Sequence, residues 1–164
     1  MPSLIGRFPN TVDTKGRLNI PAEIRRELPG TATFVLVPGL DKCIFGFPEE
    51  EWEVIDRRLQ NLSFSKTNDR LFQRFIYGEA VRRRCDDQGR IAVPPKLLEH
   101  AGITEKALVL GVSKRIEIWN PETYSAYLES QLVSYEKLME EVMLAPEPPT
   151  PTPAPGSNSS NASG

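Results

Sequence analysis

The sequence predicts an α+β fold that is rich in short antiparallel strands and built from two tandem repeats. Three observations predict it. The pattern Asp-x-x-Gly-Arg-aliphatic-x-aliphatic-Pro occurs at residues 13–21 and again at residues 86–94. Apolar positions keep their places for about forty residues when the chain is compared with itself at a shift of 73. Short apolar runs separated by turn-forming residues are typical of hairpin-connected strands in antiparallel, barrel-like sheets.

Each repeat is expected to place a turn between two strands and to follow the second strand with a short helix. Gly16 can supply the positive φ angle that a tight turn needs, and Pro21 can open a helix where its missing N–H costs nothing. In the first repeat the expected elements are strands at 6–12, 17–20, 34–38 and 43–47 and a helix at 22–28. In the second they are strands at 79–85, 90–93, 107–112 and 115–119 and a helix at 95–101.

Further helices are expected between and after the repeats. One begins after Pro48, with three glutamates in its first turn and an apolar side that includes Trp52. Asn68 is expected to cap a second one. After Pro121 a single stripe of apolar residues predicts one long helix that ends at about residue 144. The Pro-, Ser- and Asn-rich segment 145–164 lacks the apolar residues of a core and is expected to be disordered.

The charge distribution is more informative than the total charge. Twenty Lys and Arg oppose 22 Asp and Glu, so the formal net charge is −2. Six arginines against three acidic residues make 70–90 basic, whereas seven glutamates against one lysine make 117–147 acidic. Because the whole-molecule field offers little attraction to a polyanion, binding to nucleic acid would depend on local patches.

The inventory of reactive residues argues against catalysis and metal binding. Two cysteines cannot form a disulfide framework, and one histidine cannot form a histidine-based metal site. The chain offers no glycine-rich phosphate loop and no nucleophile–base pair, so we expect neither an enzyme nor a cofactor. It contains no run of about eighteen apolar residues and no secretory leader, so we expect a soluble cytoplasmic protein without a membrane partner.

The repeated motif resembles the SpoVT-AbrB family of β-rich DNA-binding domains. Two copies at this spacing, each followed by Pro and a short helix, resemble the MraZ family of bacterial transcription regulators. The resemblance covers about residues 1–144. It implies repeats at 7–54 and 80–126, linker helices at 55–79, a C-terminal helix at 127–144 and a tail at 145–164.

The resemblance implies a fold and a function that composition cannot supply. The two repeats are expected to form one pseudo-symmetric, swapped-hairpin-like barrel. Members of the family bind direct repeats in double-stranded promoter DNA upstream of the bacterial division and cell-wall gene cluster. They do so as ring-shaped homo-oligomers, and they are cytoplasmic and associated with the nucleoid.

The candidate site residues divide into two groups. Asp and Gly in each motif are expected to build the turn, because Asp accepts backbone N–H bonds and Gly tolerates the backbone angles. These turn residues are Asp13, Gly16, Asp86 and Gly89. The candidate DNA-binding residues are basic and lie in the turns, on the short helix or on the strands that enter the motifs. They are Arg7, Lys15, Arg17, Arg25, Arg26, Arg82, Arg84 and Arg90.

Two alternatives remain open for these cations. Arg17 and Arg90 can each pair with the Asp four residues before it, or reach phosphates and guanine edges. Arg82 and Arg84 share one side of a strand and Arg83 the other, so this run is either a DNA contact or an exposed face that pairs with nearby acids. Because Gln88 corresponds to Lys15, the first turn is expected to be the main DNA reader.

Two other classes of function are also considered. A non-catalytic scaffold could use the C-terminal amphipathic helix as an interaction surface. An antitoxin of the same superfamily is a further alternative, although such proteins usually carry a single copy of the motif and are much shorter.

Overall fold

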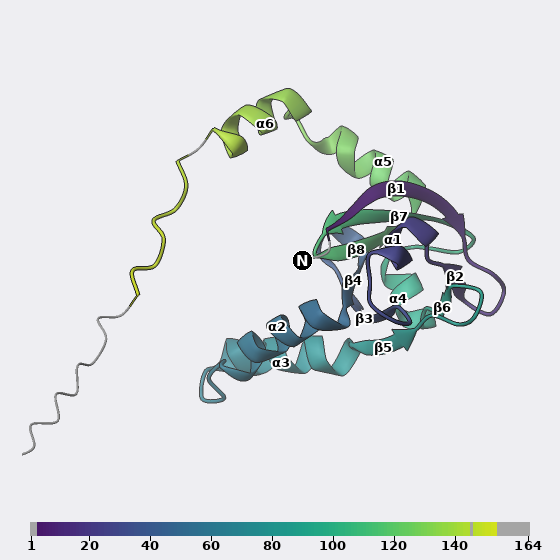
Figure 1. Ribbon diagram of the computed structural model, residues 1–164, viewed down its shortest axis with the longest axis horizontal. Helices are drawn as coiled ribbons and strands as arrows, with labels where there is room; N and C mark the ends of the chain where they lie inside the picture. The colour runs from purple at the N-terminus through teal and green to yellow at the C-terminus, as the bar shows by residue number, and fades with distance from the viewer. Residues whose placement is uncertain (1–2, 145, 154–164) are drawn as a thin grey trace, which may run out of the picture. The chain divides into compact units, whose positions relative to one another are not determined.

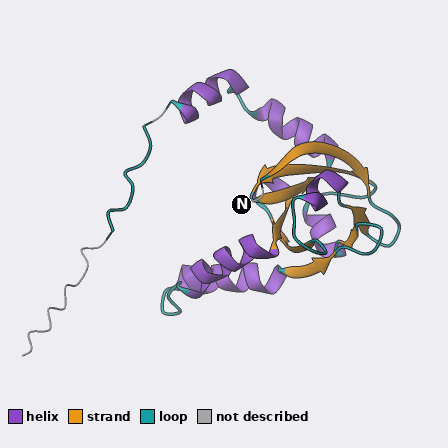
Figure 2. Ribbon diagram, viewed as in Figure 1, coloured by secondary structure: helices purple, strands orange, loops and turns teal. Residues whose placement is uncertain are grey.

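The computed structural model describes residues 3–144 and 146–153. The chain divides into two compact units, Met1–Ser130 and Gln131–Gly164 (Figures 1 and 2). All strands of the described residues belong to the first unit. The predicted α+β, β-rich architecture is confirmed.

A six-stranded antiparallel sheet forms the body of the first unit, in the order β1-β7-β8-β4-β3-β5. Its strands are β1 (Leu4–Thr11), β3 (Thr33–Pro38), β4 (Ile44–Pro48), β5 (Val81–Arg84), β7 (Lys106–Ser113) and β8 (Arg115–Trp119). A separate two-stranded ribbon pairs β2 (Arg17–Asn19) with β6 (Arg90–Ala92).

Exchanging the two repeats gives the same strand order, read from the opposite edge of the sheet. β1 and β5 are corresponding strands, as are β3 and β7, β4 and β8, and β2 and β6. The first strand of each repeat therefore pairs with the other repeat: β1 with β7, and β5 with β3. In the ribbon, Leu18 faces its own counterpart Ile91. The two repeats form one intertwined body with pseudo-two-fold symmetry.

The sheet does not close into the barrel that the sequence predicted. Strands β1 and β5 are its two edges, and neither has a second partner strand in the described part of the chain. The physical reason is that, at each Asp-x-x-Gly-Arg motif, the chain crosses from its own repeat to the other one. After the turn, the expected pairing of 6–12 with 17–20 is reduced to one bridge, between Val12 and Leu18. β2 and β6 instead form backbone hydrogen bonds with each other, as an antiparallel pair.

One core cluster contains matching apolar side chains from both repeats. Leu18, Ile20 and Ile24 lie there with Ile91, Val93 and Leu97, and all six are nearly or fully inaccessible to solvent. The short helices α1 (Ala22–Arg26) and α4 (Pro95–His100) contribute Ile24 and Leu97. Burial of side chains from both halves in one core stabilises the halves jointly rather than separately.

The correspondence at a shift of 73 holds only as far as the hairpin that joins β3 to β4 in the first repeat and β7 to β8 in the second. Pro38 faces Ile44 in the first repeat, whereas its equivalent Gly111 faces Ile116 in the second. The connection between these positions is thus five residues long in one repeat and four in the other. Beyond it the structural shift is 72, so the continuous alignment predicted from the sequence is wrong over β4 and β8.

Helices α2 (Glu49–Gln60) and α3 (Thr67–Glu79) form a hairpin between the repeats (Figure 1). Gln73 donates to the carbonyl of Leu59 at 2.8 Å, which links them side by side. The predicted cap at Asn68 is wrong, because α3 begins at Thr67 and so includes Asn68, and Lys66 takes the capping position without a side-chain bond.

The predicted long helix after Pro121 is two helices, α5 (Pro121–Ser130) and α6 (Tyr135–Met143). The hydroxyl of Ser134 accepts the backbone N–H of Lys137 at 3.2 Å and so begins α6. A serine that bonds forward in this way competes with helix continuation. Residues 146–153 contain neither helix nor strand, and the remainder of the predicted tail, 145 and 154–164, lies outside the described residues.

Candidate nucleic-acid interface

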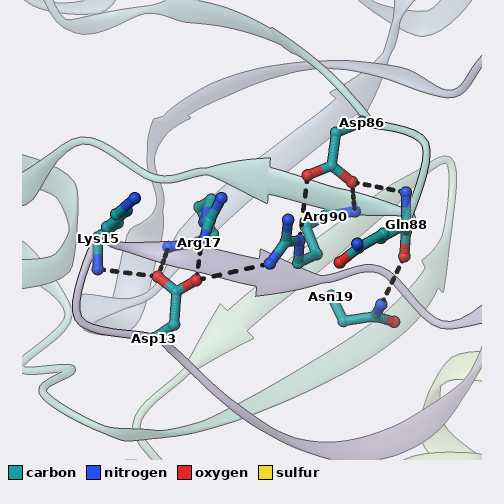
Figure 3. Close-up of polar contacts among 7 residues, drawn as sticks. All are labelled: Asp13, Lys15, Arg17, Asn19, Asp86, Gln88 and Arg90. Carbon is teal, nitrogen blue, oxygen red and sulfur yellow. Dashed lines mark hydrogen bonds and ion pairs between the residues drawn. The ribbon is translucent and has the colours of Figure 1, made fainter.

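The two Asp-x-x-Gly-Arg turns lie next to each other because β2 pairs with β6. Two equivalent backbone hydrogen bonds connect them. Ile20 N–H donates to the carbonyl of Gly89, and Val93 N–H donates to the carbonyl of Gly16, both at 2.8 Å. The side-chain amide of Asn19 adds a bond to the carbonyl of Gln88 at 3.0 Å (Figure 3). Residues 73 positions apart in the chain therefore form one composite surface, here called the paired turns (13–17 and 86–90).

Asp13 organises the first turn through its carboxylate. Oδ1 accepts the backbone N–H groups of Lys15 and Arg17, both at 2.9 Å, and Oδ2 accepts Arg17 Nε at 2.7 Å (Figure 3). The backbone bond from Arg17 is the main cause that lowers the pKa of Asp13, and the Arg17 side chain lowers it further against the opposing effect of burial. Gly16 has φ +77°, the angle predicted for this position.

Asp86 repeats the arrangement in the second turn. It accepts the backbone N–H groups of Gln88 and Arg90 at 2.9 Å and Arg90 Nε at 3.1 Å. Its pKa is likewise lowered, mainly by the backbone bond from Arg90. Gly89 has φ +78°.

Arg17 and Arg90 both make the local pair that the sequence left open as an alternative. Arg90 also reaches across the paired turns, with its Nη1 at 3.9 Å from Asp13 Oδ2. The Arg17 and Arg90 side chains retain 34% and 27% of their accessible surface. That exposure leaves part of each guanidinium available to an incoming phosphate, so contact with DNA stays a prediction.

Lys15 is the cation of the paired turns that has no carboxylate partner within the described ranges. Its backbone N–H is held by Asp13, while its side chain is exposed and extends away from that carboxylate (Figure 3). The corresponding Gln88 is neutral and also exposed.

Arg25 and Arg26 lie on α1 but have different surroundings. Arg25 Nε donates to the carbonyl of Ile20 at 2.9 Å, and its guanidinium packs on Gly89, where an added Cβ would lie only 2.6 Å from Arg25 Cζ. The side chain of Arg26 is exposed and makes no hydrogen bond or ion pair to the rest of the described chain. The crossing of the chain thus brings α1 of the first repeat beside the turn of the second.

The remaining predicted cations are dispersed. Arg82 forms an ion pair with Glu49, at 2.7 Å from Nη2, and this partner raises the pKa of Arg82. Arg84 Nη2 donates to the hydroxyl of Thr31 at 3.1 Å. Arg7 lies 5.3 Å from the centre of the Tyr124 ring. None of these three side chains forms a hydrogen bond or ion pair with the paired turns in the described structure.

Sequence reasoning missed the role of Asn19. It bridges the turns through Gln88 and accepts a bond from the side chain of Asn10. The available signal was a polar residue at the outward position between two buried aliphatics, Leu18 and Ile20, whose counterpart in the second repeat is Ala92.

Other chemistry is sparse in the described part of the chain. It contains no group of three or more His, Cys, Asp or Glu side chains that could hold a metal ion. Cys43 and Cys85 are buried free thiols, and burial is the main cause that raises the pKa of both, that of Cys43 to about 12. No described helix combines the length and apolar character needed to cross a membrane.

A family model described as "MraZ protein, putative antitoxin-like" matches residues 4–75 and again residues 76–144. The chain belongs to the MraZ family. A "Transcriptional regulator MraZ" of Limosilactobacillus reuteri is 38% identical over 139 residues, which cover 85% of this chain and 96% of the relative. Proteins with the same name from Caldanaerobacter subterraneus subsp. tengcongensis and Heliobacterium modesticaldum are 42% and 40% identical, over 84% and 85% of this chain and 94% and 96% of the relatives.

The two MraZ matches correspond to the two halves of the intertwined sheet. Their boundary lies within α3, so the first match contains β1 to β4 and the second contains β5 to β8. Each match carries one Asp-x-x-Gly-Arg turn. The paired turns therefore combine one motif from each family repeat.

Proposed function

We propose that this chain is a DNA-binding transcription regulator whose paired turns contact promoter DNA. Relatives that align with 84–85% of this chain are named transcriptional regulators. The observation that carries the proposal is the geometry of the turns. Carboxylates inside each turn fix the backbone, while Lys15 and parts of Arg17 and Arg90 remain exposed.

The turns are suited to DNA for chemical reasons. Guanidinium groups can bond to phosphates or to the O6 and N7 edge of guanine, and a lysine can supply a point charge. Rigid backbone bonds to Asp13 and Asp86 reduce the conformational entropy that is lost when the turn binds. Phosphate contacts would set the register, and a few side chains from the turns would read base edges.

A net charge of −2 makes a single subunit a weak DNA binder. We therefore propose that subunits assemble into a ring-shaped homo-oligomer that binds several direct repeats in DNA at once, which converts weak contacts into avidity. The targets we propose are promoter repeats of the division and cell-wall gene cluster, bound at the nucleoid in the cytoplasm.

An apolar surface on the α2–α3 hairpin supports self-association. Phe75 is 62% exposed and Phe72 50%, and both line a groove of about 480 Å³ together with Phe45 and Phe47. Soluble monomers rarely leave a contiguous apolar surface of this kind uncovered. A second copy of this chain is the occupant that the ring requires.

A scaffold without DNA binding is the second candidate function. It is favoured by α6, on which Leu138, Met139 and Val142 are exposed on an amphipathic helix. The two candidates differ in their response to salt. Phosphate contacts weaken steeply as salt concentration rises, whereas an apolar contact with a partner does not.

The test uses the DNA upstream of the protein's own gene. Lys15→Ala and Arg17→Ala are each expected to abolish binding in a gel shift and to leave the oligomer mass in light scattering unchanged. Gln88→Ala is the matched control, because it occupies the position of Lys15 in the second turn and removes no charge. Undiminished affinity in both Lys15 and Arg17 variants, or a monomeric wild type that ignores the promoter, would contradict the proposal.

A further inference from the structure

Three arginines without a carboxylate partner in the described chain lie in or next to one hollow of the first unit. The hollow has a volume of about 330 Å³ and lies between α1 and the second turn. Arg25, Arg26, Thr31, Asp86 and Gly89 contribute to its lining. Arg84 is not part of the lining, but its Nη2 donates to the hydroxyl of Thr31, which is.

The pairing of these arginines differs from that of the other cations near the motifs. Arg25 bonds to a backbone carbonyl, Arg84 bonds to a neutral hydroxyl, and Arg26 has no hydrogen-bond partner among the described residues. Arg17, Arg82 and Arg90 are each ion-paired with an acid. An anion in the hollow therefore displaces no existing ion pair.

One acid lies at the edge of the hollow. Asp86 already accepts bonds from the N–H of Gln88 and from the backbone and side chain of Arg90. Its charge is thus engaged with Arg90, outside the group of three arginines. The hollow retains a positive field that favours an anion.

The second repeat does not contain an equivalent of this site. At the shift of 73, Leu98 corresponds to Arg25, Glu99 to Arg26 and Thr11 to Arg84. The equivalent position beside the first turn is occupied by Leu98, which packs 3.8 Å from where a Cβ on Gly16 would lie. The site therefore occurs once in each chain.

We infer that this hollow binds one phosphate group of the DNA backbone, with Arg26 and Arg84 as its donors. Arg25, fixed between Ile20 and Gly89, adds charge at the base of the site. Two guanidinium groups around one phosphate provide charge-assisted hydrogen bonds of matching geometry. The inference rests on the proposed function, and it separates this phosphate contact from the base-reading turn that carries Lys15.

The experiment measures binding of the full chain to the promoter fragment as a function of salt. Arg26→Gln and Arg84→Gln are each expected to reduce the slope of log K against log salt by about 1. At 0.1 M salt this corresponds to an affinity about eightfold lower. The loss of affinity is expected to be equal on promoter and scrambled DNA. Arg26→Lys, which keeps the charge, is expected to retain most of the affinity that Arg26→Gln loses.

Arg58→Gln is the matched control, because it removes the same charge from an exposed position on α2. If the Arg26 and Arg84 variants behave like this control while Lys15→Ala abolishes binding, the hollow is not a phosphate site and the proposed function stands. If wild type does not bind the promoter at all, both proposals fail.

A second measurement separates backbone phosphate from a free phosphate ligand. Thermal unfolding of the protein without DNA is compared in inorganic phosphate and in chloride at equal ionic strength. A higher Tm of wild type in phosphate that disappears in Arg26→Gln supports the assigned residues. If that response occurs while the salt slope for DNA is unchanged by the variant, the ligand is free phosphate and the inference is overturned.

Discussion

The turns of the two repeats have the same backbone and opposite charge. Gly16 and Gly89 have φ angles of +77° and +78°, and each turn is closed by an Asp that accepts equivalent bonds. The first turn, 13–17, carries two cations and one anion, whereas the second, 86–90, carries one cation and two anions. The turn scaffold is thus common to both halves while their surfaces differ.

The short helices differ in the same direction as the turns. Arg25 and Arg26 on α1 correspond to Leu98 and Glu99 on α4. Because the chain crosses at the paired turns, the basic helix α1 lies beside the acidic turn, and α4, in which Lys96 balances Glu99, lies beside the basic turn. An intertwined duplication can therefore distribute the cations of one repeat over both flanks of a common surface.

The largest expected effect tests whether the scaffold is symmetric. Leu18→Ala and Ile91→Ala are each expected to lower the free energy of unfolding by about 3 kcal/mol, because both side chains are fully buried and face each other in the ribbon. Urea unfolding measures the loss. The double variant is expected to lose less than the sum, since the two cavities merge. If the two single variants lose clearly unequal amounts of free energy of unfolding, the two repeats do not contribute symmetrically to the core.

A smaller effect is expected at the glycines of the turns. Gly16→Ala and Gly89→Ala force an alanine into a positive φ angle and are each expected to cost about 1–2 kcal/mol of stability. The environments differ, because a Cβ at Gly89 meets the Arg25 guanidinium and one at Gly16 meets the carbonyl of Val93 at 3.1 Å. NMR of the Arg25 side chain is expected to change in the Gly89 variant alone, and an equal change in both would contradict this asymmetry.

The smallest effect concerns acid. The pKa values of Asp13 and Asp86 are lowered in the folded protein, mainly by backbone bonds. Their stabilising contribution is therefore present above the unfolded pKa of about 4 and is lost as pH falls through the lower folded value. Asp13→Asn and Asp86→Asn are expected to be destabilised at pH 7 and to approach wild type at low pH. Urea unfolding measures the difference in the free energy of unfolding between each variant and wild type. If that difference is the same at every pH, the carboxylate charge does not contribute to stability.

Much of the architecture was predictable from local patterns. The repeat, the short strands and the turn glycines follow from residue types that lie close together in the chain. The partners of Arg17 and Arg90 were also among the predicted alternatives, because each Asp lies four residues away. The predicted barrel is not formed, because the strand after each turn pairs with its counterpart in the other repeat instead of with the strand before the turn. The predicted single C-terminal helix was wrong, because Ser134 begins a new helix.

The sequence alone therefore determined the duplication, the conformation of each turn and the alternation that buries Leu18 and Ile91. These features depend on hydrogen bonds and periodicities within a few residues. Tertiary structure alone decided that β2 pairs with β6, that α1 packs on the second turn and that Arg25 and Arg26 line one hollow with residues of that turn. Those contacts join segments about 70 residues apart, and periodicity specifies which face of a strand is buried but not which strand lies beside it.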